Sequence, residues 1–88
     1  SPYDQGLHTE AADVAARLGD HPRAVRERRA VLALDPTDKA GAHYQLAVAL
    51  RAAGDRDGAR REVLKALEQA PSFEKAQILL LELRGGGG

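Results

Sequence analysis

Three histidines are the residues best suited to chemistry, because an imidazole can bind a metal or transfer a proton near neutral pH. They are His8, His21 and His43, and no two of them are three or four positions apart. The sequence therefore lacks the HExxH pattern, which puts two metal ligands on one face of a helix. It also contains no cysteine, so a thiolate zinc site is excluded. We expect no metal site, no cofactor and no catalytic histidine.

The other charged residues favour neither catalysis nor nucleic-acid binding. Acidic residues are scattered over expected helix starts and polar faces, and nothing couples a nucleophile to a base. Four arginines lie in RAVRERR (residues 23–29), and Arg60 and Arg61 form a second cluster. Such clusters are typical of a phosphate-binding patch or of a solvated helix face. Thirteen basic residues balance thirteen acidic ones, and no aromatics are interleaved, so the solvated face is favoured.

The size and composition of the chain indicate one small helical domain rather than an enzyme. It has 88 residues, of which 43% are hydrophobic and 30% charged, as in globular proteins. Much of the apolar content is alanine, a strong helix former that fills little volume. No stretch approaches the roughly 20 apolar residues that span a bilayer, and a cytoplasmic location is favoured. The Arg/Ala-rich usage is typical of bacteria with GC-rich genomes.

The chain repeats itself at an offset of 35 residues. Ten identical pairs join residues 6, 8, 12, 19, 20, 24, 26, 27, 32 and 36 to residues 41, 43, 47, 54, 55, 59, 61, 62, 67 and 71. A period of this length indicates a supersecondary unit that stacks on copies of itself.

Each unit is predicted to consist of two helices. The first helices end at Gly19 and Gly54, which suit a left-handed C-cap, and the second stop before Pro36 and Pro71. The predicted helices span residues 2–18, 21–34, 38–53, 56–69 and 72–84, with no strand. Expected N-caps are Ser1, Asp20 or His21, Asp55 and Ser72.

Residues 42–71, AHYQLAVALRAAGDRDGARREVLKALEQAP, resemble a tetratricopeptide repeat, whose unit has about 34 residues. The match is carried by Tyr44, Leu46, Ala47, Leu50, Gly54, Ala59, Val63, Ala66, Leu67 and Pro71. The first unit matches at Ala12, Leu18, Gly19, Ala24, Val25, Val31, Leu32, Leu34, Asp35 and Pro36, and it departs from the family at Ala11, Ala15 and Arg28.

The resemblance implies an all-α superhelix of stacked helix pairs over residues 1–84. Repeat 1 would cover about residues 5–38, repeat 2 about 39–71, and residues 72–84 would form a capping helix, with 85–88 as a tail or linker. His8 and His43 stand where the family usually has an aromatic on the inner helix, so repeat packing explains them. The implied function is a non-catalytic protein–protein interaction module that forms part of a larger protein and binds a peptide or protein segment.

In this family the first helix of each pair lines a concave face where partners bind. By resemblance, the groove residues are Thr9, Glu10, Asp13, Arg17, Tyr44, Gln45, Val48, Arg51, Ile78, Leu79 and Glu82. Some members clamp a C-terminal carboxylate through Lys, Asn and Arg. Of those positions only Lys75 agrees here, since the others hold Thr9, Asp13, Gln45 and Leu79. An apolar or basic peptide, helical or extended, is therefore the expected partner.

The last predicted helix has two apolar faces. Phe73, Ala76, Leu80 and Leu83 form a stripe that would pack on the core, with Leu79 at its edge. Ile78 and Leu81 lie on the opposite side. The rest of a parent chain, a second copy or a peptide would bury this pair, or both would remain exposed. A homo-oligomerisation element that pairs through this helix is therefore the alternative function.

Overall fold

The structure, a computed structural model, describes residues 2–85. Within this range the chain is all-α, with five helices and no strand, as predicted. The predicted cap at Ser1 and tail residues 86–88 lie outside the described range, and every predicted helix end lies within two residues of the observed one. The helices are α1 (Pro2–Arg17), α2 (His21–Ala33), α3 (Lys39–Ala52), α4 (Arg56–Gln69) and α5 (Glu74–Gly85).

Aspartates cap the starts of α2, α3 and α4. The carboxylates of Asp20, Asp38 and Asp55 each accept a hydrogen bond from the backbone N–H three residues further on, at 3.2, 2.8 and 2.8 Å. Each bond satisfies one of the N–H groups that the first turn leaves without a partner. The predicted caps at Asp20 and Asp55 are confirmed, whereas the cap at Asp38 was not anticipated.

Glycines end α1 and α3. Gly19 and Gly54 have φ angles of 77° and 89°, a left-handed conformation that only glycine adopts without steric cost. The residue after each glycine donates its N–H to the carbonyl five positions back, at 2.8 and 2.9 Å. These bonds are those of the Schellman motif, which satisfies the last carbonyls of a helix.

The start of α5 differs from the prediction. Ser72 lies in a turn and the helix begins at Glu74, two residues later than expected. The backbone N–H of Phe73 donates to the carbonyl of Ala70 at 3.1 Å, and its ring lies 5.3 Å from that of Tyr44. This contact with a distant helix holds Phe73 in the turn.

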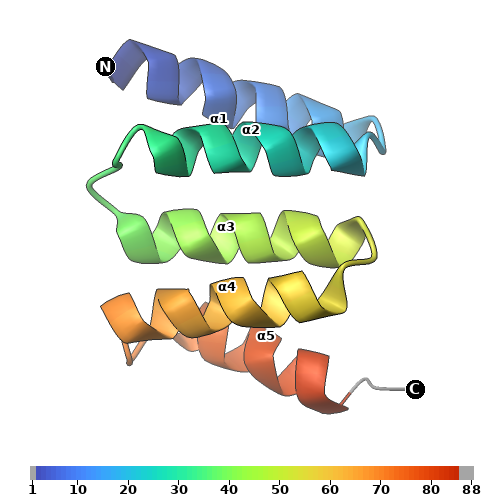
Figure 1. The fold of residues 1–88 in the computed structure, drawn as a ribbon, viewed down its shortest axis with the longest axis vertical. Helices are drawn as coiled ribbons and strands as arrows, with labels where there is room; N and C mark the ends of the chain where they lie inside the picture. The colour runs from blue at the N-terminus through green and yellow to red at the C-terminus, as the bar shows by residue number, and fades with distance from the viewer. Residues whose placement is uncertain (1, 86–88) are drawn as a thin grey trace.

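The five helices form a stack in chain order, and each packs mainly on its neighbours in the sequence (Figure 1). Four repeat-related alanines are at most 2% exposed where the first and second helices of each pair lie together. Small side chains allow helix axes to approach closely. These alanines are Ala12 and Ala24 in the first pair and Ala47 and Ala59 in the second.

The buried face of α5 also corrects the prediction. Leu79 and Leu83 are 4% and 1% exposed, whereas Leu80 is only partly buried at the margin of the core. The prediction had put Leu80 in the core and Leu79 at its edge. The core face of α5 is therefore rotated by about one residue from the predicted one, and an ion pair between Glu82 of α5 and Arg51 of α3 lies beside it.

Candidate binding groove

Three adjoining hollows extend over α1, α3 and α5. The first, about 160 Å³, is formed by α1, the second half of α2, the α2–α3 link and the start of α3. The second, about 370 Å³, lies between the start of α3 and the start of α5, and the third, about 290 Å³, lies further along the same two helices. Gln45 lines the first two, and Tyr44 and Lys75 line the last two. Because they share these residues, the three hollows adjoin one another, and together we call them the inner groove.

Two aromatic rings form the middle of the inner groove. The ring centroids of Tyr44 and Phe73 are 5.3 Å apart and the ring planes are tilted by 51°. Both side chains are partly buried. Tilted rings at this separation attract one another through their quadrupoles. The pair therefore gives the groove a firm apolar surface and ties the start of α5 to α3.

The third hollow combines apolar walls with a charged rim. Val48 of α3 and Ile78 of α5 are 39% and 54% exposed and line it together with Lys75. Nη1 of Arg51 lies 2.7 Å from Oε1 of Glu82, so an ion pair crosses from α3 to α5. Because both side chains are about half exposed, the pair contributes little to stability. It places one positive and one negative group beside the apolar walls.

The charges on the second hollow are mixed. Asp38 and Glu74 bring carboxylates to its wall, and Lys75 brings an ammonium group. All three residues are exposed. One oxygen of Asp38 accepts the backbone N–H at the start of α3. A ligand with apolar side chains and a basic group would find a complementary surface here.

The structure brings eight of the eleven predicted groove residues together on the inner groove. They are Thr9, Tyr44, Gln45, Val48, Arg51, Ile78, Leu79 and Glu82. The other three are residues of α1 that lie elsewhere. Glu10 lines a separate hollow that α1 forms with the start of α2. Asp13 forms an ion pair with Arg28 of α2, and Arg17 is exposed at the end of α1.

The ion pair between Asp13 and α2 involves Arg28, a position at which the first unit departs from the tetratricopeptide pattern that it resembles. Arg28 occupies a position where that family prefers a bulky apolar residue. Its side chain is only 14% exposed, and Nη2 lies 2.7 Å from Oδ1 of Asp13. The arginine stem thus covers apolar surface while its guanidinium bonds a carboxylate on α1.

Two histidines form hydrogen bonds with glutamates that the sequence analysis did not pair with them. Nδ1 of His8 lies 2.7 Å from Oε1 of Glu27, and Nδ1 of His43 lies 2.8 Å from Oε1 of Glu62. An ionised carboxylate only accepts, so each Nδ1 carries the proton. Each bond joins the first helix of a pair to the second. The signal was present, because both histidines and both glutamates are identical at the 35-residue offset.

The second pair is also linked to a lysine. Nζ of Lys65 lies 3.0 Å from Oε2 of Glu62, which is 9% exposed. Burial raises the pKa of Glu62, but the hydrogen bonds and charges of His43 and Lys65 outweigh it and lower the pKa below its ordinary value of 4.5. Among the described residues there is no group of three or more His, Cys, Asp or Glu side chains that could hold a metal ion. His8 and His43 join the first helix of each pair to the second through these hydrogen bonds.

The structure separates the two residues of the predicted association patch. Ile78 and Leu81 are 54% and 65% exposed, as their place on the helix predicted. Ile78, however, lines the third hollow of the inner groove, and Leu81 does not. Association through α5 would thus rest on Leu81 alone, and it stays a prediction.

None of the helices in residues 2–85 is long and apolar enough to cross a membrane. The sequence matches no protein-family model and no curated protein. The inner groove and its residues are therefore the observations from which a function can be inferred.

Proposed function

We propose that the chain is a non-catalytic interaction module that binds a segment of another protein in the inner groove. The observation that carries the proposal is the row of three hollows that share lining residues across α1, α2, α3 and α5. Individually they are small, but together they offer an extended track of the kind that a peptide occupies. The resemblance to tetratricopeptide repeats supports the same interpretation.

The chemistry of the groove selects the kind of segment. Val48 and Ile78 would receive an apolar side chain in the third hollow, and the Tyr44–Phe73 pair would receive a flat or aromatic one. Asp38 and Glu74 would attract a basic residue beside these apolar contacts. We therefore infer that the partner is an apolar segment carrying a lysine or arginine, helical or extended.

The test uses peptides selected on the intact chain from a phage-displayed random library. Val48→Lys puts a charge into the third hollow, and we expect it to weaken binding of the selected peptides at least about tenfold. Leu64→Lys is the matched control, because Leu64 is 46% exposed on α4 and lines none of the three hollows. Fluorescence polarisation with labelled peptides measures both affinities.

Tyr44→Ala should produce a similar loss, and circular dichroism establishes that this partly buried substitution leaves the fold intact. Selected peptides that bind Val48→Lys as tightly as the original chain would show that the groove is not the site. A library that yields no peptide dependent on Tyr44 or Val48 would count against the function itself.

A further inference from the structure

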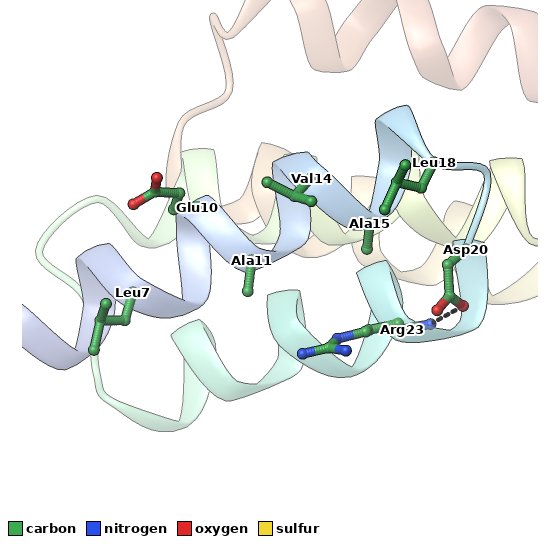
Figure 2. A pocket seen from close by; sticks show the side chains of 8 residues that line it. All are labelled: Leu7, Glu10, Ala11, Val14, Ala15, Leu18, Asp20 and Arg23. Atoms are coloured by element: carbon green, nitrogen blue, oxygen red, sulfur yellow. Dashed lines mark hydrogen bonds between the residues drawn. The ribbon is translucent and has the colours of Figure 1, made fainter.

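The outer face of α1 carries an apolar stripe that the inner groove does not use. Leu7, Val14 and Leu18 are 48%, 39% and 78% exposed, and Ala11 lies among them. With the start of α2 they line a hollow of about 330 Å³ (Figure 2). Single exposed aliphatics are common, but four aligned apolar residues beside a hollow form a surface suited to packing.

The internal repeat shows what this face does elsewhere in the same chain. Leu7 and Val14 correspond to Ala42 and Ala49 of α3, and the same positions in α5 are Ala76 and Leu83. Ala76 and Leu83 are 0% and 1% exposed, and the helix on which α5 mainly packs is α4. The equivalent face of α1 thus has the position of a helix-docking surface. No other helix of residues 2–85 covers it.

The spacing along α1 specifies how another helix would pack there. Leu7, Ala11, Val14 and Leu18 follow one another at intervals of four, three and four residues. Leu18 is the first residue after α1, and its N–H still donates to the carbonyl of Val14 at 3.0 Å, as in the helix. These intervals are the a/d spacing of two heptads, in which alternate side chains pack into the spaces of a facing helix. The small Ala11 near the middle allows the two helix axes to approach closely.

The charges that flank the stripe make it self-complementary. Glu10 and Arg17 are exposed and lie seven positions apart on the same edge of the stripe. If two α1 helices pack antiparallel, this edge meets itself, so Glu10 of each copy faces Arg17 of the other. Opposite charges flanking a heptad seam select partner and orientation. A parallel pair would place Glu10 beside Ala15 and leave both charges without a partner across the seam.

We propose that two copies of this chain associate through antiparallel packing of their α1 helices. Leu7 of one copy then lies against Leu18 of the other, and Ala11 lies against Val14. A lone helix of this length is marginal in water, but α1 is already held by α2, so pairing incurs no cost of helix formation. The proposal does not depend on binding in the inner groove, which lies on a different surface.

The first experiment measures self-association of the full 88-residue chain by sedimentation equilibrium over a range of concentrations. We expect a reversible dimer with a dissociation constant in the micromolar range. Leu18→Lys should raise that constant at least about tenfold. Leu81→Lys is the matched control on α5, since Leu81 is 65% exposed, and it should leave the constant unchanged.

The second experiment tests the charges. Arg17→Glu alone places a glutamate of one copy opposite Glu10 of the other. The two like charges repel, so this variant should weaken the dimer. The double variant E10R/R17E restores an opposite pair across the seam and should recover most of the affinity. Added salt should reduce the difference between the variants, because exposed ion pairs are screened.

The third experiment tests the relative orientation of the two α1 helices by disulfide cross-linking. Because the chain contains no native cysteine, only the introduced cysteines can form disulfides. An equimolar mixture of Leu7→Cys and Leu18→Cys chains should form the mixed disulfide under mild oxidation. Disulfides between identical variants should be minor. A predominance of identical pairs would indicate parallel packing and contradict the proposal.

Two further outcomes would overturn the proposal. One is a strict monomer at every concentration reached. The other is a dimer that survives Leu18→Lys and dissociates with Leu81→Lys, which would assign association to α5. Because the substituted leucines are exposed, circular dichroism should show unchanged helicity in each variant, and peptide binding in the inner groove should be unaffected.

Discussion

At the scale of single residues, the two His–Glu pairs form the same hydrogen bond but differ in how deeply they are buried. The side chains of His8 and Glu27 are 40% and 18% exposed, whereas those of His43 and Glu62 are 18% and 12% exposed. Water screens the first pair more strongly, so its contribution to stability is smaller. The second pair lies between α3 and α4 near the middle of the stack, where an unsatisfied carboxylate would be costly.

Glu62 makes the stability of the domain depend on pH. Its pKa is lower in the folded chain than the ordinary value of 4.5, so the folded state binds a proton less readily than the unfolded state. The stabilisation is therefore fully present above pH 4.5 and is lost as the pH falls through the folded-state pKa. We expect Glu62→Gln to lower the free energy of unfolding at pH 7 by about 1.5–3 kcal/mol, and this deficit should shrink below pH 4.5.

Urea denaturation at a series of pH values measures this deficit. Glu27→Gln is the control, because it removes the equivalent carboxylate from the more exposed pair, and its effect at pH 7 should be smaller. A Glu62→Gln deficit that stays constant from neutral to acid pH would contradict the assignment of this titration to Glu62.

At the scale of the elements, the link between α2 and α3 contains a residue, Asp35, whose backbone conformation restricts which side chain can stand there. Asp35 has a φ angle of 54°, whereas Ala70, at the equivalent place after α4, has a φ of −143°. A left-handed residue other than glycine is uncommon, and aspartate is among those that tolerate it. The exposed ion pair of Asp35 with Lys39, at 3.0 Å, adds little.

Substitutions at Asp35 should follow this backbone conformation. Asp35→Val should lower the free energy of unfolding by about 1–2 kcal/mol, because a β-branched side chain is strained at positive φ. Asp35→Gly loses the same ion pair without the strain, and it should be close to neutral. Thermal unfolding followed by circular dichroism compares the two, and equal stability of both variants would show that the conformation is not strained.

At the scale of the whole molecule, α5 closes one end of the stack through only one of its faces. Leu79 and Leu83 belong to the core cluster, while Leu81 points away from it. A small domain is only marginally stable, so the loss of one core leucine is a large fraction of its total stability. The other end of the stack, at α1, exposes the stripe that we propose as a dimer surface.

The leucines of α5 provide a matched comparison of the two faces. Leu79→Ala should lower the free energy of unfolding by about 2–5 kcal/mol, because it leaves a cavity in the core. Leu81→Ala should change it by less than about 0.5 kcal/mol. Ile78→Lys combined with Leu81→Lys should also leave helicity nearly unchanged. Urea denaturation measures all three, and unfolding of the double variant would place both residues in the core.

Much of the fold was predictable because its determinants are local in sequence. The caps at Asp20 and Asp55 and the left-handed Gly19 and Gly54 act within one helical turn of the residues concerned. From such signals the ends of four helices were predicted to within one residue of the observed ends. The start of α5 was not, because Phe73 is held outside the helix by Tyr44, which is far away in sequence.

The candidate groove was predictable only in part. The spacing of Tyr44, Val48 and Arg51 puts them on one face of α3, and the structure places all three on the third hollow. For α1, nothing in the sequence distinguishes Thr9, which lines the inner groove, from Glu10, which lines the outer hollow. Adjacent residues point in directions about 100° apart, so a small rotation of the helix decides which surface each one reaches.

The sequence by itself thus determined the number of helices, their ends and the 35-residue repeat, because backbone hydrogen bonds, caps and apolar spacing are local. Only the tertiary structure decided the rotation of each helix. Packing between residues distant in sequence buried Leu79 in place of Leu80, paired His43 with Glu62, and left Leu18 exposed just after α1. These contacts minimise exposed apolar surface and unpaired polar groups over the whole stack, which no single helix can do alone.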